Sequence, residues 1–142
     1  MKRADLNIDR VKVGDECSNN ILVTADLLDN FITISGDSSL IHLDSKYARN
    51  AGFNNRVVHG ALISSFFSAL IGTQLPGNSG LLLEISCKFH NPAFVNNRIF
   101  VKATITDIHE NIGCISIRLQ AEDDNAKKLS TGKALVKIRA QP

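Results

Sequence analysis

The chain of 142 residues has only three cysteines, Cys17, Cys87 and Cys114, and no two of them form a C-x-x-C pair. Because they are odd in number and far apart in sequence, we expect reduced packing residues and no disulfide. The four histidines have no cysteines or paired carboxylates at ligand spacing, which predicts no zinc site. The N-terminus lacks the apolar segment of a secretory signal. These absences predict a cytoplasmic location.

Neither sign of charge dominates, since 16 Lys and Arg residues stand against 14 Asp and Glu residues. A formal net charge of +2 gives no electrostatic reason to expect binding to nucleic acid or an anionic membrane. The most apolar stretch, residues 57–71, is too short and too polar to span a bilayer, which takes about 20 residues. There is no repeat or linker either, so we expect residues 1–142 to form a single domain.

The first half of the sequence has helical periodicity. Thr24 is a plausible N-cap, and Gly36 is a plausible stop for a helix between them. Asp44 is a second cap, for a short helix that ends by Gly52. A third helix runs from about residue 59 to residue 72 and is apolar on nearly every side, which predicts that other structure encloses it.

The second half alternates apolar and polar residues with a period of two. The pattern predicts strands over 81–89, 99–106, 115–120 and 133–139, and a further strand is expected near 17–24. In the first of these, the expected core-facing residues are Leu81, Leu83, Ile85, Cys87 and Phe89. Alternation with one polar face is typical of antiparallel strands covered on one side. The sequence therefore predicts an α+β fold, with about five antiparallel strands curled around the central helix.

The segment SGDSSLIHLD, residues 35–44, carries the first candidates for chemistry. Asp37 follows the predicted end of a helix, and His42 comes five residues later. A short loop held by Leu40 and Ile41 would bring the carboxylate and the imidazole to one point, where they could act on one water as an acid–base pair. The spacing by itself also fits an aspartate that starts a turn and a hydrogen-bonded loop histidine.

His59 and Gly60, at the start of the central helix, are the second candidates. Backbone N–H groups at a helix N-terminus lack acceptors within the helix and can stabilise an oxyanion. A glycine there allows a substrate carbonyl to approach the backbone closely. The same two residues also fit a helix-start glycine next to a packing histidine.

Taken together, SGDSSLIHLD and the later VVHG resemble the MaoC-like, (R)-specific enoyl-CoA hydratase family, in which the motif reads approximately S-G-D-x-N-P-[LI]-H-x-D and then V-H-G. The resemblance implies a hot-dog fold, with Asp37 and His42 as the acid–base pair. It also implies that Gly60, His59 and Ser68 form the oxyanion and substrate-binding site. In that site the Gly60 N–H polarises the thioester carbonyl, and Ser68 on the central helix lines the pocket. The implied substrate is an acyl thioester of coenzyme A or of a carrier protein. The implied enzyme is a homodimer or a multiple of dimers, and it needs no metal or redox cofactor.

The sequence departs from the motif at one place, where Ser39-Leu40 replaces the usual Asn-Pro. Leucine lacks the fixed φ of proline, so the positions of Asp37 and His42 depend on other contacts. Two other functions are open to this fold: a non-catalytic acyl-thioester binding module and a thioesterase. Arg56, Lys46 and Lys88 could contact the phosphates of coenzyme A, but we interpret each of them as a surface charge.

Overall fold

The computed structural model describes residues 3–140 and 142, and its centre is one five-stranded antiparallel sheet. Along the sheet the strands follow the order β1-β3-β4-β5-β2. Their bounds are β1 Glu16–Leu22, β2 Gly80–Phe89, β3 Arg98–His109, β4 Cys114–Glu122 and β5 Lys128–Ile138. The 3-10 turn η1 Ile8–Arg10 precedes β1, and a second one, η2 Glu110–Ile112, joins β3 to β4. The predicted strands and the α+β class are confirmed.

The helices are α1 Ala25–Ser35, α2 Leu40–Leu43, α3 Ser45–Asn50 and α4 Gly60–Thr73. Thr24 caps α1 as predicted, because its Oγ1 accepts the N–H of Leu27 at 3.1 Å. Gly36 ends α1 with a φ of +74°, a conformation that glycine adopts at little cost. Asp44 caps α3 by accepting two backbone N–H groups. None of the helices within the described residues has the length and apolarity needed to cross a bilayer.

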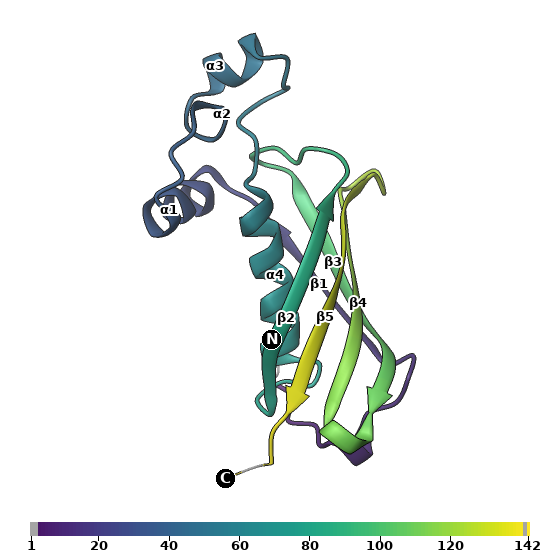
Figure 1. Cartoon of the computed structure of the whole chain (residues 1–142). Helices are drawn as coiled ribbons and strands as arrows, with labels where there is room; N and C mark the ends of the chain where they lie inside the picture. The colour runs from purple at the N-terminus through teal and green to yellow at the C-terminus, as the bar shows by residue number, and fades with distance from the viewer. Residues whose placement is uncertain (1–2, 141) are drawn as a thin grey trace.

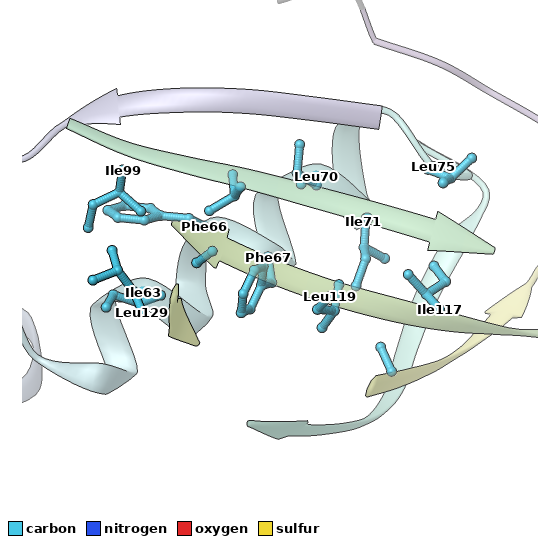
Figure 2. Close-up of a cluster of buried hydrophobic side chains, with 14 of the residues drawn as sticks. Ile63, Phe66, Phe67, Leu70, Ile71, Leu75, Ile99, Ile117, Leu119 and Leu129 are labelled. Carbon is cyan, nitrogen blue, oxygen red and sulfur yellow. The ribbon is translucent and has the colours of Figure 1, made fainter. Parts of the chain in front are cut away.

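The core lies between α4 and the sheet (Figure 2). The buried side chains of α4 are Leu62, Ile63, Phe66, Phe67, Leu70 and Ile71. Contrary to the expectation of burial on every side, its opposite face is exposed and consists of small residues, Ala61, Ser65, Ser68, Ala69 and Gly72. We call these five residues the outer face of α4. The sheet covers one side of the helix only.

Strand β2 does not follow the simple alternation that the sequence predicts. Its register against β5 shifts between Leu82 and Glu84, which leaves Leu83 as an extra residue in a bulge. Because one inserted residue exchanges the two faces of a strand, Leu82 faces the core in place of Leu81 and Leu83. Phe89, at the end of the strand, is half exposed, but it keeps the face of Ile85 and Cys87, and its ring lies against Gly60 of α4. The core-facing positions predicted for Leu81 and Leu83 are therefore wrong.

Helices α1, α2 and α3 gather at one end of the molecule, beyond the point where α4 begins (Figure 1). The end of α1, all of α2 and the first residues of α4 thus approach one another. This arrangement brings the segment around Asp37 and His42 to the N-terminus of α4.

Candidate active site

The segment between Asp37 and Asp44 forms a helical turn, α2, where the sequence analysis expected a loop. Leu40 is 48% exposed and does not anchor this segment, whereas His42 is buried. The Asp37 side chain is 53% exposed, and its Oδ1 accepts the N–H of Ser39 at 3.3 Å. The carboxylate is therefore open to solvent at a fixed position, beside an imidazole that the protein encloses.

His42 points one ring nitrogen at the backbone and the other at Asp37. Nδ1 lies 2.7 Å from the carbonyl oxygen of Val57. Because a carbonyl only accepts, the neutral ring carries its proton on Nδ1 and its lone pair on Nε2. Nε2 is 3.8 Å from Oδ2 of Asp37, beyond hydrogen-bond reach. One water can hydrogen-bond both atoms at about 2.8 Å, so the pair can hold a water between them.

His59 lies directly behind this pair and is only 2% exposed. Its ring stacks on that of His42, with centroids 3.7 Å apart, and Phe31 meets it edge-on. Its Nε2 donates to the backbone carbonyl of Asp37 at 2.9 Å, which places the lone pair on Nδ1. Nδ1 is buried and has no hydrogen-bond partner within the described residues.

Burial lowers the pKa of His59, and the neighbouring His42 lowers it further, against the effect of the bond to Asp37. A proton on Nδ1 would lie in the core with no acceptor. His59 is therefore a neutral positioning residue, which holds the Asp37 backbone and supports the plane of the His42 ring.

Asp37, His42 and His59 form the one group within the described residues whose ligand atoms converge, all lying within 4.8 Å of one another. Nε2 of His59 carries a proton for the Asp37 carbonyl and is not free to bind a metal. Two ligands then remain, fewer than the three protein ligands of a typical catalytic zinc site. The donor set thus fits acid–base chemistry better than metal binding.

Gly60 begins α4 beside His42. The N–H groups of Leu62 and Ile63 both donate to the His59 carbonyl, whereas those of Gly60 and Ala61 precede the first intrahelical hydrogen bond. A cavity of about 320 Å³ opens here, and His42, Gly60, Ile63 and Phe89 are among its lining residues. A Cβ at position 60 would lie 2.8 Å from the Phe89 ring, so a larger residue there requires this half-exposed ring to move.

A larger depression, of about 850 Å³, lies over strands β2 to β5. Its lining includes Glu84, Lys88 and Arg118, but neither Asp37 nor His42. We place the chemistry at the smaller cavity, because that cavity combines the His42 imidazole with the start of α4.

Of the predicted site residues, Asp37, His42, His59 and Gly60 come together, and Ser68 does not join them in the single chain. Ser68 is exposed on the outer face of α4, two turns beyond Gly60, and does not line the 320 Å³ cavity. A pocket role for Ser68 stays a prediction that requires a further surface packed against this face.

Sequence reasoning missed the contribution of Arg56, which it interpreted as a surface charge. The side chain is only 12% exposed, and its Nε donates to the backbone carbonyl of His42 at 2.7 Å. The signal available in sequence was its place just before VVHG, but the partner lies 14 residues earlier. The structure corrects this interpretation, whereas Lys46 and Lys88 are exposed as expected.

Comparisons with known proteins agree with this architecture. The solved (R)-hydratase from A. caviae involved in PHA biosynthesis superposes with a TM-score of 0.88 at 29% identity, covering 90% of this chain and 97% of that one. In sequence, the chain is 32% identical to the (R)-specific enoyl-CoA hydratase of Aeromonas caviae over 108 residues, 76% of this chain and 81% of that protein. It is 33% identical to the mitochondrial 3-hydroxyacyl-[acyl-carrier-protein] dehydratase of Arabidopsis thaliana, over 63% of this chain and about half (52%) of the relative.

The sheet curled along one helix is thus the hot-dog fold of the (R)-hydratases. The model of the MaoC like domain family matches residues 11–126, which include the whole candidate site. The chain belongs to the MaoC-like domain family.

Proposed function

We propose that this chain is a hydro-lyase that hydrates a trans-2-enoyl thioester to the (R)-3-hydroxyacyl thioester and catalyses the reverse dehydration. The observation that carries the proposal is the 3.8 Å gap between the lone-pair nitrogen of His42 and the Asp37 carboxylate. Hydratases and dehydratases of this reaction class are also the relatives found by sequence.

In the hydration direction, a water held between Asp37 and His42 is the nucleophile. His42 Nε2 accepts one proton as the water oxygen bonds to the β-carbon, and the electron pair of the double bond moves toward the thioester carbonyl. The same acid–base pair then delivers a proton to the α-carbon, so that H and OH have been added and both side chains return to their starting state. Dehydration follows the same steps in reverse.

Gly60 has a separate task, at the carbonyl end of the substrate. The developing enolate oxygen needs a hydrogen-bond donor, and the N–H at the start of α4 is available beside the cavity. A preorganised backbone donor of this kind stabilises the charge that appears in the transition state. Gly60 and the Asp37–His42 pair thus act on opposite ends of the conjugated system.

The reaction needs no metal or redox cofactor, because it transfers only protons and water. Coenzyme A or the phosphopantetheine arm of a carrier protein belongs to the substrate. Fatty-acid metabolism supplies thioesters of this kind, and the three free cysteines are consistent with action in the cytoplasm. Activity that is lost on dialysis against EDTA and restored by a divalent ion would contradict the cofactor-free mechanism.

We also propose that the working unit is a homodimer. Strand β2 is an edge of the sheet, and Leu81 and Leu83 on it are exposed. Exposed sheet edges are usually paired or covered, and two-fold symmetry is the commonest way to do so. A partner packed here could also cover the outer face of α4 and so bring Ser68 into a pocket.

The reaction class is tested by incubating the protein with crotonyl-CoA while following the conjugated thioester absorbance and free thiol together. Loss of absorbance without thiol release is expected for a hydratase. Thiol release would show a thioesterase instead. No change in either signal would favour a non-catalytic binding module or a substrate with a different acyl-chain length, which a longer enoyl-CoA distinguishes.

A further inference from the structure

Residues 41–42 and residues 56–57 are joined by three hydrogen bonds. The Val57 N–H donates to the Ile41 carbonyl at 2.9 Å, and His42 Nδ1 donates to the Val57 carbonyl at 2.7 Å. The third bond runs from Arg56 Nε to the His42 carbonyl at 2.7 Å. Arg56 is therefore the one side chain in this set that holds the backbone of His42.

The guanidinium group is itself oriented from a second element. Its Nη2 pairs with the carboxylate of Asp29 on α1. The backbone of Arg56 is fixed too, because its carbonyl accepts the N–H of Val95 at 3.0 Å and its N–H donates to the Asn55 side chain. Arg56 thus connects α1 and α2 to the segment just before α4.

Helix α2 depends on such external contacts, since an isolated single turn is unstable. Its N-cap, Ser39, makes no side-chain capping bond, and Leu40 is largely exposed. At its C-terminal end, the Ile41 carbonyl accepts the Val57 N–H, and the His42 carbonyl accepts a hydrogen bond from Arg56 Nε. In this chain, where Ser39-Leu40 replaces Asn-Pro, α2 lacks the fixed φ of a proline, and these bonds hold its C-terminal end.

We propose that Arg56 is a positioning residue, which holds α2 so that Nε2 of His42 faces Asp37 across the water site, and that Asp29 orients Arg56 for this task. The inference rests on the proposed hydratase function. The simpler alternative is that Arg56 and Asp29 form a surface ion pair, which would add little to stability and nothing to catalysis.

The test compares Arg56→Lys and Asp29→Asn with the matched control Arg49→Lys. Lysine keeps the charge, but its single ammonium cannot bond the His42 carbonyl and the Asp29 carboxylate with the geometry of the planar guanidinium. Arg49 is exposed on α3, where its guanidinium donates to the Ser45 side chain at 3.4 Å. Turnover of crotonyl-CoA, KM and Tm are measured for each variant. A second readout is the ¹⁵N spectrum of the His42 ring, assigned by its loss in His42→Gln.

Arg56→Lys should lower kcat by about 10- to 100-fold, because catalysis is sensitive to misplacement of about 1 Å. KM should stay within twofold and Tm near the wild-type value, and the ring spectrum should shift from the Nδ1–H form toward a mixture of tautomers. Asp29→Asn should give a smaller change in the same direction, and Arg49→Lys none.

Wild-type kcat and an unchanged ring spectrum in Arg56→Lys would overturn the inference. A kcat loss that is matched by a large loss of Tm, in both Arg56→Lys and Asp29→Asn, would also overturn it in favour of a purely structural role. If the wild-type protein hydrates neither crotonyl-CoA nor a longer enoyl-CoA, the hydratase proposal fails, and the tautomer shift alone still decides the role of Arg56.

Discussion

Nε2 of His42 lies 3.8 Å from Oδ2 of Asp37, and the two side chains differ in their surroundings. His42 is buried and bonded through Nδ1 to the Val57 carbonyl, whereas the Asp37 carboxylate is half exposed. The imidazole is thus fixed in one tautomer, and the carboxylate stays open to water and substrate. In the proposed mechanism, this difference lets His42 define the direction of proton transfer while Asp37 helps to hold the water.

Gly60→Ala should lower kcat/KM by about 100-fold or more, because the new Cβ would lie 2.8 Å from the Phe89 ring and displace either the ring or the start of α4. Gly72→Ala is the matched control on the same helix, since a Cβ there meets nothing within 4 Å in the described part of the single chain. It should retain activity within twofold and gain roughly 0.5–1 kcal/mol of stability. Equal activity in the two variants would remove the close-approach role of Gly60.

Ser68→Ala should reduce kcat/KM less than tenfold, because Ser68 lies outside the cavity that holds His42 and Gly60. The assay is steady-state hydration of crotonyl-CoA and of a longer enoyl-CoA, since a pocket-lining residue affects substrates of different length unequally. If a folded Ser68→Ala protein were as inactive as a variant of Asp37, the serine would have a chemical role that this account lacks.

Light scattering at micromolar protein concentration should give a mass near twice the chain mass of 15.5 kDa, or a multiple of that dimer mass. Replacing Leu83, exposed on edge strand β2, with lysine should shift the mass toward the monomer, because a charge would then be buried at the interface. A wild-type mass near 15.5 kDa with full hydratase activity would contradict the homodimer.

His59 should make stability depend on pH in a defined direction. Burial holds its pKa below the ordinary value of 6.5, so the unfolded chain takes up a proton near pH 6.5 while the folded protein does not. The free energy of unfolding should therefore fall as the pH falls below about 6.5, by at most about 1.4 kcal/mol per pH unit from this one group. Below the lowered pKa the folded protein also binds the proton, and the free energy of unfolding stops falling because of this group.

Urea unfolding at pH 7.5 and pH 5.5 measures this effect, with His59→Gln as the comparison. Glutamine keeps a side-chain donor for the Asp37 carbonyl but does not titrate. The wild-type protein should lose more stability than the variant between the two pH values. Equal losses would show that His59 does not carry the pH dependence.

The parts of the fold that depend on local sequence were predictable. Thr24 and Gly36 bound α1 because capping involves neighbours within a few residues. The bulge at Leu83 was not predictable, because a register shift is set by pairing with a distant strand. The exposed outer face of α4 was also missed, since serine, alanine and glycine occur both in buried helices and on exposed helix faces.

In the candidate site, too, the residues in local motifs were predictable and the contacts between distant residues were not. Asp37, His42 and Gly60 could be selected from sequence because they lie in two short motifs. The contacts that define their geometry connect residues 14 and 15 positions apart, as in the bonds of His42 to Arg56 and Val57. No short pattern indicates which carbonyl fixes a histidine tautomer, so this part of the site required the structure.

His42→Ala should lower kcat by about 10²–10⁴-fold, because it removes the base that accepts the proton of the water. Circular dichroism and Tm are the controls, because His42 is buried and its loss leaves a space beside His59. Retention of more than half of the wild-type turnover would exclude His42 from the mechanism.

The most direct test of the central claim is the turnover of crotonyl-CoA by Asp37→Asn. Asparagine keeps the shape of the side chain and an oxygen for the Ser39 N–H, and it removes only the charge and the ability to exchange a proton. Asp26→Asn, an exposed position on α1, is the matched control and should behave as wild type. The account predicts that Asp37→Asn folds normally with kcat reduced by about 10²–10⁴-fold. Hydration at more than half of the wild-type rate would contradict it.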